Sequence, residues 1–438
     1  MQTPRVLVVP GGTSVGAAAL AYASLSKLAE QARTASDGAM DEAPSSHKRT
    51  VVVMRPPSEI PHTSLRHLQT DVSHAFPELP EDVRNDPALL DGVDVVIPTS
   101  GSSTGTPHLV GLSTEALIAS VHSTHAALEG PGRWILALPA HHIAGAQVLM
   151  RSAVAGFSPM VVDTDSGFRP ADLLSSIAGA TQDSQVPGYL SLVPVQLRAC
   201  LDAGEEVIRA LASLAGVLVG GSSITKELLQ AARNHGLRVV TTYGMTETGG
   251  GCVYNSRPLP GVTVRAVDVD GQSRLAIAGP MLMTKYLDGP SPFIDEGGAR
   301  WLLTGDIGRI ASNGDVQVLG RSDDVIVTGG LSVAPGPVRD AVLSAPGVRD
   351  SWILDLEDER WGHVVTAAVV RDSSHSADLD SWARSIRDHV GARLGRAQAP
   401  RVVVPLHTLP MLESGKVDRS RVRALVMEQI EHGEHWRR

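Results

Sequence analysis

The sequence predicts an α/β protein with a large N-terminal domain, a β-rich subdomain and a small α+β C-terminal domain. Its 438 residues exceed one typical domain and are enough to bury a large apolar core. From about residue 93, short β-rich apolar runs alternate with longer amphipathic runs, and after about residue 260 β-like segments dominate. The N-terminal domain is therefore expected to hold mostly parallel sheets flanked by helices.

The alternating region contains five short apolar runs that are typical of buried strands. They lie at 94–98, 134–139, 189–193, 216–221 and 237–244. Amphipathic stretches such as 115–129 and 225–236 are expected to be helices between them. Ligands of such sheets bind beyond the carboxyl ends of the strands, so the residues that follow each run are the candidate site.

The C-terminal part of the chain has a different pattern. Strands are expected at 262–271, 274–279 and 315–320, and a second domain is expected to begin near 320, which divides the chain into 1–320 and 321–438. Within the second domain, helices are expected at 337–345 and 378–394, and strands at 351–356, 363–370 and 401–406. The polar, aperiodic stretch 33–49 is interpreted as a mobile loop.

Composition narrows the class of protein. The 38 basic and 47 acidic residues give a formal net charge of −9 without a basic block, which argues against nucleic acid or an anionic membrane surface as partner. Cys200 and Cys252 are too few and too far apart for a disulfide framework, so a reduced cytoplasmic setting is expected. Signal-peptide and membrane-spanning runs are not expected either, because the apolar runs are too short.

Two glycine-rich turns follow strand-like runs. TSGSSTG at 99–105 offers backbone N–H groups and hydroxyls to a phosphate, although it lacks the lysine of a nucleotide P-loop and can also be an ordinary turn. PGGTSVG at 10–16 does not fit the dinucleotide fingerprint, and a plain strand-to-helix turn is expected there.

Further polar residues point to nucleotide chemistry. In YGMTETGGG, Thr246 is placed to donate to a phosphate oxygen and Glu247 to hold Mg²⁺. Asp306 and Arg321 are suited to sugar hydroxyls and phosphate, and Lys416 follows Gly415 on an expected exposed turn. Each of these residues taken alone also fits a solvated surface turn.

The segment LPAHHIAGAQVLMRS combines histidines with an arginine in an apolar stretch. His141 and His142 are expected to point to opposite faces of an extended chain, so they do not predict a shared metal. An unpaired guanidinium in such a stretch is costly to bury. Arg151 is therefore expected either to reach solvent or to meet a buried carboxylate, that of a ligand included.

Taken in order, these segments resemble the adenylate-forming superfamily of acyl-CoA synthetases, peptide-synthetase adenylation domains and luciferases. The resemblance runs through TSGSSTGTP, HHIAG, GGSS, YGMTETGG, GPMLMTKY, TGD, GRSDDVIVTGG and SGKVDR, over about residues 97–420. Within the superfamily, LPAHHIAGAQVLMRSAVAG and YGMTETGGGCVYN are most similar to o-succinylbenzoate-CoA ligases of menaquinone biosynthesis. The resemblance implies a two-step ligation of an aromatic carboxylic acid to coenzyme A, with ATP and Mg²⁺, through an acyl-adenylate.

The resemblance also implies roles for individual residues. It makes Lys416, Thr246 and Glu247 catalytic, with Glu247 on Mg²⁺, and it places His142 and Arg151 at the acyl substrate. It makes the small domain mobile, with its hinge at Asp323. It assigns ATP and AMP binding to Thr99, Ser100, Gly101, Ser102, Ser103, Thr104, Gly105, Gly220, Gly221, Ser222, Thr242, Tyr243, Gly244, Met245, Asp306 and Arg321.

The sequence departs from the superfamily pattern at several positions. His108 replaces the lysine that usually follows the proline of the phosphate loop, and Leu331, Ser332 and Gly336 replace family residues of the small domain. Two alternatives stay open: another aryl- or fatty-acyl-CoA ligase with the same machinery, and a non-catalytic nucleotide-binding homologue. A homodimer is left open as well.

Overall fold

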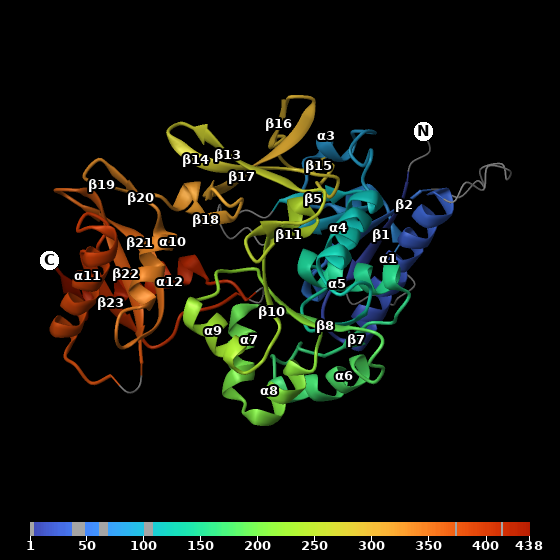
Figure 1. Cartoon of the computed structure of the whole chain (residues 1–438). Coiled ribbons are helices and arrows are strands. Elements are labelled where there is room, and N and C mark those ends of the chain that lie inside the picture. The colour runs from blue at the N-terminus through green and yellow to red at the C-terminus, as the bar shows by residue number, and fades with distance from the viewer. Residues whose placement is uncertain (1–3, 37–48, 61–68, 100–107, 373–374, 413–414) are drawn as a thin grey trace. The chain divides into compact units, whose positions relative to one another are not determined.

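The computed structural model describes the chain except for residues 1–3, 37–48, 61–68, 100–107, 373–374 and 413–414 (Figure 1). The chain forms two compact units. The larger comprises Met1–Thr263 and Ile277–Leu302, and the smaller comprises Val264–Ala276 and Leu303–Arg438. The larger unit is α/β and the smaller is α+β, so the predicted fold class is confirmed. The expected boundary after residue 320 stays a prediction.

The first sheet of the larger unit has the strand order β15-β5-β4-β2-β1-β3. Its strands are β1 (Arg5–Pro10), β2 (Thr50–Arg55), β3 (Gln69–Thr70), β4 (Val95–Pro98), β5 (Leu109–Leu112) and β15 (Lys285–Tyr286). β1, β2 and β4 are parallel, and their continuous apolar runs, mostly of valine, suit strands that are covered on both faces. The sequence pattern did not indicate that the strand at 95–98 belongs to a different sheet from the four strands expected between 134 and 244.

The second sheet has the order β12-β11-β10-β9-β8-β6-β7. Its strands are β6 (Arg133–Leu136), β7 (Met160–Val161), β8 (Gly188–Leu192), β9 (Gly216–Val219), β10 (Val239–Met245), β11 (Gly250–Tyr254) and β12 (Arg257–Pro258). From β7 to β10 all pairs are parallel, as expected, whereas β11 and β12 add an antiparallel edge.

Helices connect and cover these strands (Figure 1). They are α1 (Val15–Ser36), α2 (Val72–Ala75), α3 (Glu81–Arg84), α4 (Thr114–Ala127), α5 (Ile143–Ala155), α6 (Leu173–Ala180), α7 (Pro194–Asp202), α8 (Glu205–Ala212) and α9 (Lys226–Asn234). The turn at 10–14 joins β1 to α1, as the glycine pattern predicts. Of the stretch expected as a mobile loop, residues 33–36 belong to α1, and 37–48 lie outside the described residues.

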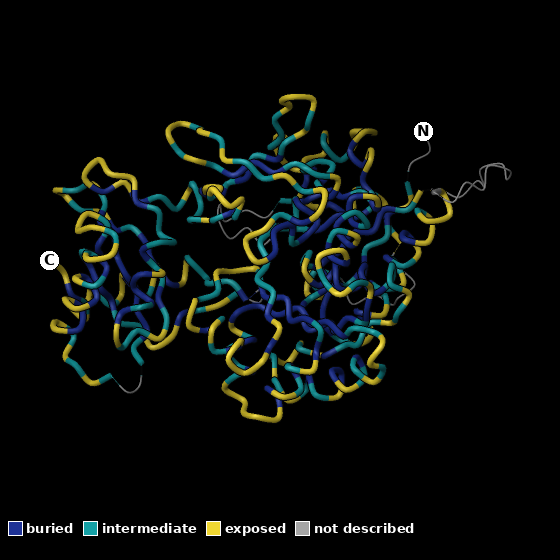
Figure 2. The backbone as a smooth tube through the Cα atoms, in the orientation of Figure 1, coloured by how far each residue is buried: buried dark blue, intermediate teal, exposed yellow. Residues whose placement is uncertain are grey.

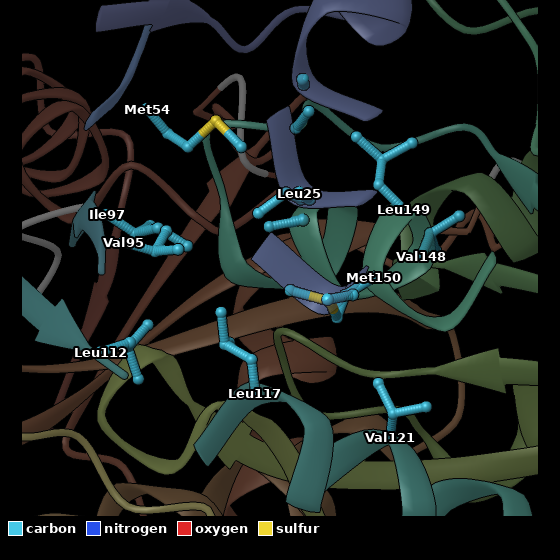
Figure 3. Close-up of a cluster of buried hydrophobic side chains, with 14 of the residues drawn as sticks. Leu25, Met54, Val95, Ile97, Leu112, Leu117, Val121, Val148, Leu149 and Met150 are labelled. Carbon is cyan, nitrogen blue, oxygen red and sulfur yellow. The ribbon is translucent and has the colours of Figure 1, made fainter. Parts of the chain in front are cut away.

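One apolar cluster joins the first sheet to α1, α4 and α5 (Figure 3). Leu25, Met54, Ile97, Leu117 and Leu149 come from five different elements, and all are almost fully buried. Figure 2 shows this buried interior beneath exposed loops. The packing fixes α4 and α5 against the sheets, and these two helices carry residues that position the candidate site.

A third sheet has the order β13-β14-β17-β16, with β18 paired to β17. Its strands are β13 (Thr263–Val269), β14 (Gln272–Ala278), β16 (Phe293–Glu296), β17 (Ala299–Ile310) and β18 (Val316–Arg321). The antiparallel pairing of β17 with β18 sets Asp306 opposite Arg321, two residues that the sequence indicates as nucleotide ligands.

The sheet of the C-terminal segment has the order β20-β19-β22-β23-β24, with β21 paired to β22. Its elements are β19 (Ile326–Thr328), β20 (Leu331–Val333), α10 (Pro335–Leu343), β21 (Val348–Asp358), β22 (Gly362–Arg371), α11 (Leu379–Leu394), β23 (Val402–Leu406), α12 (Arg419–Glu431) and β24 (Trp436–Arg437). Alternate residues of β22 point to opposite faces. Val365 and Val369 pack in a core with α10 and α11, whereas Val364 and Val370 pack in another core with α12. Among the described residues, no helix is both long enough and apolar enough to span a membrane.

Candidate active site

Thr246 and Glu247 lie in a 3₁₀ turn, η4 (Thr246–Thr248), directly beyond the carboxyl end of β10. The Oγ1 of Thr248 accepts a hydrogen bond from the backbone N–H of Met245 at 2.9 Å and donates to the carbonyl oxygen of Gly250 at 2.7 Å. Gly249, with φ of 59°, returns the chain into β11, a conformation that glycine adopts without strain. The turn is therefore held from within and presents the two predicted side chains at the expected edge of the sheet.

Two buried polar side chains hold this turn from outside. Ser120 Oγ of α4 and Gln147 Nε2 of α5 donate to the carbonyl oxygen of Gly249, at 3.0 and 2.7 Å. The backbone N–H of Met283 donates to the carbonyl oxygen of Glu247 at 2.8 Å. Sequence reasoning missed Ser120 and Gln147; the available signal was a polar residue inside a buried, mostly apolar helical run.

The loop after β9 lies against β10. A Cβ atom on Gly220 would come within 2.1 Å of Thr242 Oγ1, so the close approach of these two predicted nucleotide residues requires glycine. Gly221 has a φ of 81°, which also favours glycine. The structure thus brings together one group of predicted residues at this edge: Gly220, Gly221, Ser222, Thr242, Tyr243, Gly244, Met245, Thr246 and Glu247.

The described ends of the phosphate loop are bonded to each other. The backbone N–H of Thr99 donates to the carbonyl oxygen of His108, and the backbone N–H of His108 donates to Thr99 Oγ1, both at 2.8 Å. These bonds close the base of the loop. The predicted ligands Ser100, Gly101, Ser102, Ser103, Thr104 and Gly105 lie outside the described residues.

The Glu247 carboxylate accepts a hydrogen bond from Tyr286, whose hydroxyl lies 2.6 Å from Oε1. Among the described residues, there is no group of three or more His, Cys, Asp or Glu side chains that could hold a metal. Mg²⁺ usually needs only one or two carboxylates when substrate phosphates and water supply its other oxygen ligands. Glu247 therefore fits a magnesium ion that arrives with a triphosphate.

α5 carries the predicted acyl-site residues at opposite ends. His142 is the N-cap residue, and its ring lies with its centroid 4.3 Å from that of His141, so the expectation that the two rings point apart is wrong. His141 Nδ1 is 2.8 Å from the carbonyl oxygen of Gly11, which draws the ring toward the turn after β1. Arg151 lies nine residues from His142, about 13 Å along the helix axis.

Arg151 is a buried cation. Its side chain packs over the Trp134 ring with 4.8 Å to the ring centroid, and its guanidinium donates to the Tyr254 hydroxyl at 3.4 Å. No carboxylate of a described residue lies within ion-pair distance of it, and burial lowers its pKa. The expectation that Arg151 reaches solvent is wrong, and no described residue places a buried carboxylate against it.

The smaller unit holds a second group of predicted residues. Arg321 lies 3.5 Å from the Asp306 carboxylate and 3.2 Å from that of Asp323. Burial acts to lower the pKa of Arg321, but these two carboxylates outweigh it and raise the pKa. Gly305 leaves the space that the guanidinium fills, since a Cβ there would lie 2.6 Å from it.

Lys416 lies just before α12, in a segment bridged to the chain at Met411. Its carbonyl oxygen accepts a hydrogen bond from the backbone N–H of Leu412 at 2.7 Å. Next to the predicted hinge, Asp324 pairs with Arg419 of α12 at 2.5 Å. This ion pair connects the segment that follows β18 to the helix that follows Lys416.

The C-terminal segment also contains an arginine-lined hollow that sequence reasoning missed. The hollow has a volume of about 600 Å³, and its lining includes Trp361 and five arginines, Arg360, Arg387, Arg396, Arg401 and Arg438. The Arg401 guanidinium lies 4.1 Å from the Trp361 ring centroid. Burial and the neighbouring arginines lower the pKa of both Arg387 and Arg401. These arginines are scattered over 79 residues of sequence in a chain of net negative charge, so composition gave no sign of the hollow.

The family is identified by sequence models over both parts of the chain. The model described as AMP-binding enzyme matches residues 4–287, and that described as AMP-binding enzyme C-terminal domain matches 338–416. The chain belongs to the AMP-binding enzyme family, and the predicted resemblance to adenylate-forming enzymes is confirmed. It is an AMP-forming acid–thiol ligase.

Among its relatives is a probable 2-succinylbenzoate–CoA ligase of Mycobacterium tuberculosis, 40% identical over 75% of this chain and 84% of that protein. A medium/long-chain-fatty-acid–CoA ligase of the same species is 31% identical over 75% of this chain and 61% of that protein. The fold is similar to the structure of o-succinylbenzoate coenzyme A synthetase from Bacillus subtilis in complex with ATP and magnesium ion. That likeness has a TM-score of 0.66 and 22% identity, and it covers 92% of this chain and 94% of the other.

Proposed function

We propose that this ligase joins 2-succinylbenzoate to coenzyme A through an acyl-adenylate. The 40% identity to the probable 2-succinylbenzoate–CoA ligase carries the proposal. The geometry of the site supports it, because the substrate has a second carboxylate, and Arg151 is a buried cation to which no described residue offers a carboxylate.

In the first step, a carboxylate oxygen of the acid attacks the α-phosphorus of ATP, and the bond to pyrophosphate breaks. Both reactants are anions, so positive charge is needed where the new bond forms. Lys416 and the magnesium of Mg·ATP, held by Glu247, supply that charge. Thr246 donates to the α-phosphate, the loop at 99–105 takes the β- and γ-phosphates, and Asp306 with Arg321 binds the ribose.

In the second step, the thiolate of coenzyme A attacks the acyl carbonyl carbon, and the bond to AMP breaks. Coenzyme A also carries a phosphorylated adenine nucleotide with several negative charges. The arginine-lined hollow suits those phosphates, since arginine binds phosphate through two parallel hydrogen bonds. This assignment gives the missed residues a role in the same reaction.

The direct test is to incubate the enzyme with ATP, Mg²⁺, coenzyme A and a panel of acids, and to detect the thioesters by mass spectrometry. The 2-succinylbenzoyl thioester is the expected main product, with Lys416→Ala as the inactive control. A preference for medium- or long-chain fatty acids would favour the second candidate function, which the 31% identical relative suggests. Binding of ATP in isothermal titration without any product would indicate a non-catalytic homologue.

The role of Arg151 has a separate test. Arg151→Ala is expected to raise the KM for 2-succinylbenzoate about 10-fold or more, because a charge-assisted hydrogen bond is lost. The KM for ATP should change little. Arg209→Ala, at an exposed helical position, is the control. Equal increases in both KM values, or a loss of thermal stability without any change in KM, would contradict a role in substrate binding.

A further inference from the structure

Tyr286 lies between two predicted functional segments of the larger unit. It belongs to β15, which pairs with β5 at the edge of the first sheet, opposite Val110. Its hydroxyl donates to Glu247 Oε1 at 2.6 Å. Its ring packs against the imidazole of His108, with 4.8 Å between the ring centroids and 30° between the ring planes. One side chain thus contacts both the predicted magnesium ligand and the end of the phosphate loop.

His108 is itself held in place. Its Nδ1 lies 3.3 Å from the Asp288 carboxylate, and the same carboxylate oxygen accepts from the backbone N–H of Leu109 at 3.1 Å. The backbone N–H of His108 donates to Thr99 Oγ1. These contacts fix the position of the imidazole that replaces the family's lysine.

The chain of contacts restricts the Glu247 carboxylate. A free glutamate samples several rotamers, and ordering it for a metal costs free energy. A short bond from a neutral hydroxyl to one carboxylate oxygen fixes the plane of the group while the other oxygen stays available to a cation. Groups that orient a metal ligand in this way strongly influence metal affinity.

We propose that Tyr286 is a positioning residue that orients Glu247 toward the magnesium of Mg·ATP, and that His108 and Asp288 hold Tyr286 in place. The inference rests on the proposed function, in which Mg·ATP is a substrate. It gives the departure at His108 a role: the residue contributes packing to the site, where the family's lysine contributes charge.

The test uses equilibrium binding to the full chain, which does not depend on turnover. Isothermal titration measures ATP binding with Mg²⁺ and with EDTA, and the ratio of the two affinities is the magnesium-dependent gain. Tyr286→Phe keeps the ring that packs on His108 and removes only the hydroxyl. We expect it to reduce the gain about 10-fold, the lower end for loss of a group that orients a metal ligand, and to leave binding in EDTA within about twofold.

Two further variants separate orientation from packing. Tyr22→Phe removes a hydroxyl that donates to the carbonyl oxygen of Phe157, away from the site, and is expected to behave as wild type. His108→Ala removes the ring contact and is expected to reduce the gain as Tyr286→Phe does, whereas His108→Phe keeps a ring and should retain most of it. If Tyr286→Phe folds poorly, the difference in magnesium-dependent gain between His108→Ala and His108→Phe tests the same inference.

An unchanged gain in Tyr286→Phe, or an equal loss in Mg²⁺ and in EDTA, would overturn the inference. The proposed function fails differently: the wild type would show a magnesium-dependent gain but form no 2-succinylbenzoyl thioester. A wild type with no magnesium-dependent gain would overturn the role of Tyr286 even if thioester forms.

Discussion

His125 in α4 is a buried histidine next to the buried cation Arg151. Its pKa is lowered from 6.5 to about 4, mainly by burial and also by the charges of Arg151 and His122. The unfolded chain therefore takes up a proton near pH 6.5 that the folded chain accepts only near pH 4. The free energy of unfolding should fall as the pH drops through this window. At pH 5 this residue should have lowered it by about 2 kcal/mol.

His125→Phe keeps an aromatic ring and removes the titrating group. The free energy of unfolding that is lost on acidification should therefore be smaller by about 2 kcal/mol. The measurement is the free energy of unfolding in urea at pH 7.5 and pH 5. His235→Phe makes the same replacement at an exposed position, at the end of α9, and is the control. If wild type and His125→Phe lose equal stability between the two pH values, the histidine does not carry the effect.

At the residue scale, the sequence indicated those candidate residues that lie within short motifs. Thr246 and Glu247 belong to one glycine-rich turn, and Asp306 and Arg321 are cross-strand neighbours on adjacent strands. The partners of Gln147 and Tyr286 could not be predicted, because they lie 102 and 39 residues away in the sequence. Hydrophobic periodicity reports which face of an element is buried, not which polar group it meets there.

At the element scale, strong patterns placed the strands and helices well. The five apolar runs of the alternating region are strands β4, β6, β8, β9 and β10, and the helices expected at 115–129 and 225–236 are α4 and α9. Short edge strands such as β15 and β24 were not predicted, since two residues carry no measurable periodicity. Strand order could not be predicted either, because long-range packing decides which strands pair. β4, for example, belongs to a different sheet from β6, β8, β9 and β10.

The short helix η5 (Ser322–Asp324) is the element for which the sequence predicts a hinge, at Asp323. Asp323→Pro fixes one backbone dihedral and should restrict rotation there. We expect adenylation, measured as pyrophosphate release, to stay within about threefold of wild type. Thioester formation from preformed acyl-adenylate and coenzyme A should fall about 10-fold or more.

The control for this variant must account for the ion pair between Asp323 and Arg321. Asp323→Asn removes the charge and keeps the backbone free, so it should spare both half-reactions. An equal loss of the two half-reactions in Asp323→Pro would argue against a hinge at this position. A loss in Asp323→Asn that matches the proline variant would point to the ion pair instead.

At the scale of the whole molecule, the two compact units divide the predicted nucleotide ligands. Thr246 and Glu247 lie in the larger unit, and Asp306, Arg321 and Lys416 in the smaller. Sequence motifs indicated all five because each lies in a short, contiguous motif. The same reasoning did not indicate the arginine-lined hollow of the smaller unit. Its arginines come from α11 itself, from segments before and after α11, and from Arg438.

That hollow has a practical consequence for the choice of buffer. Five arginines and one acidic residue, Asp358, line this space, so we expect inorganic phosphate or sulfate at tens of millimolar to occupy it. If the hollow takes the phosphates of coenzyme A, inorganic phosphate should compete with coenzyme A and leave the KM for ATP nearly unchanged, with chloride of equal ionic strength as the control. Competition against ATP alone would contradict this assignment. Kinetics recorded in phosphate buffer would then understate the affinity for the thiol substrate, and a phosphate wash should release the enzyme from a resin that carries immobilised coenzyme A.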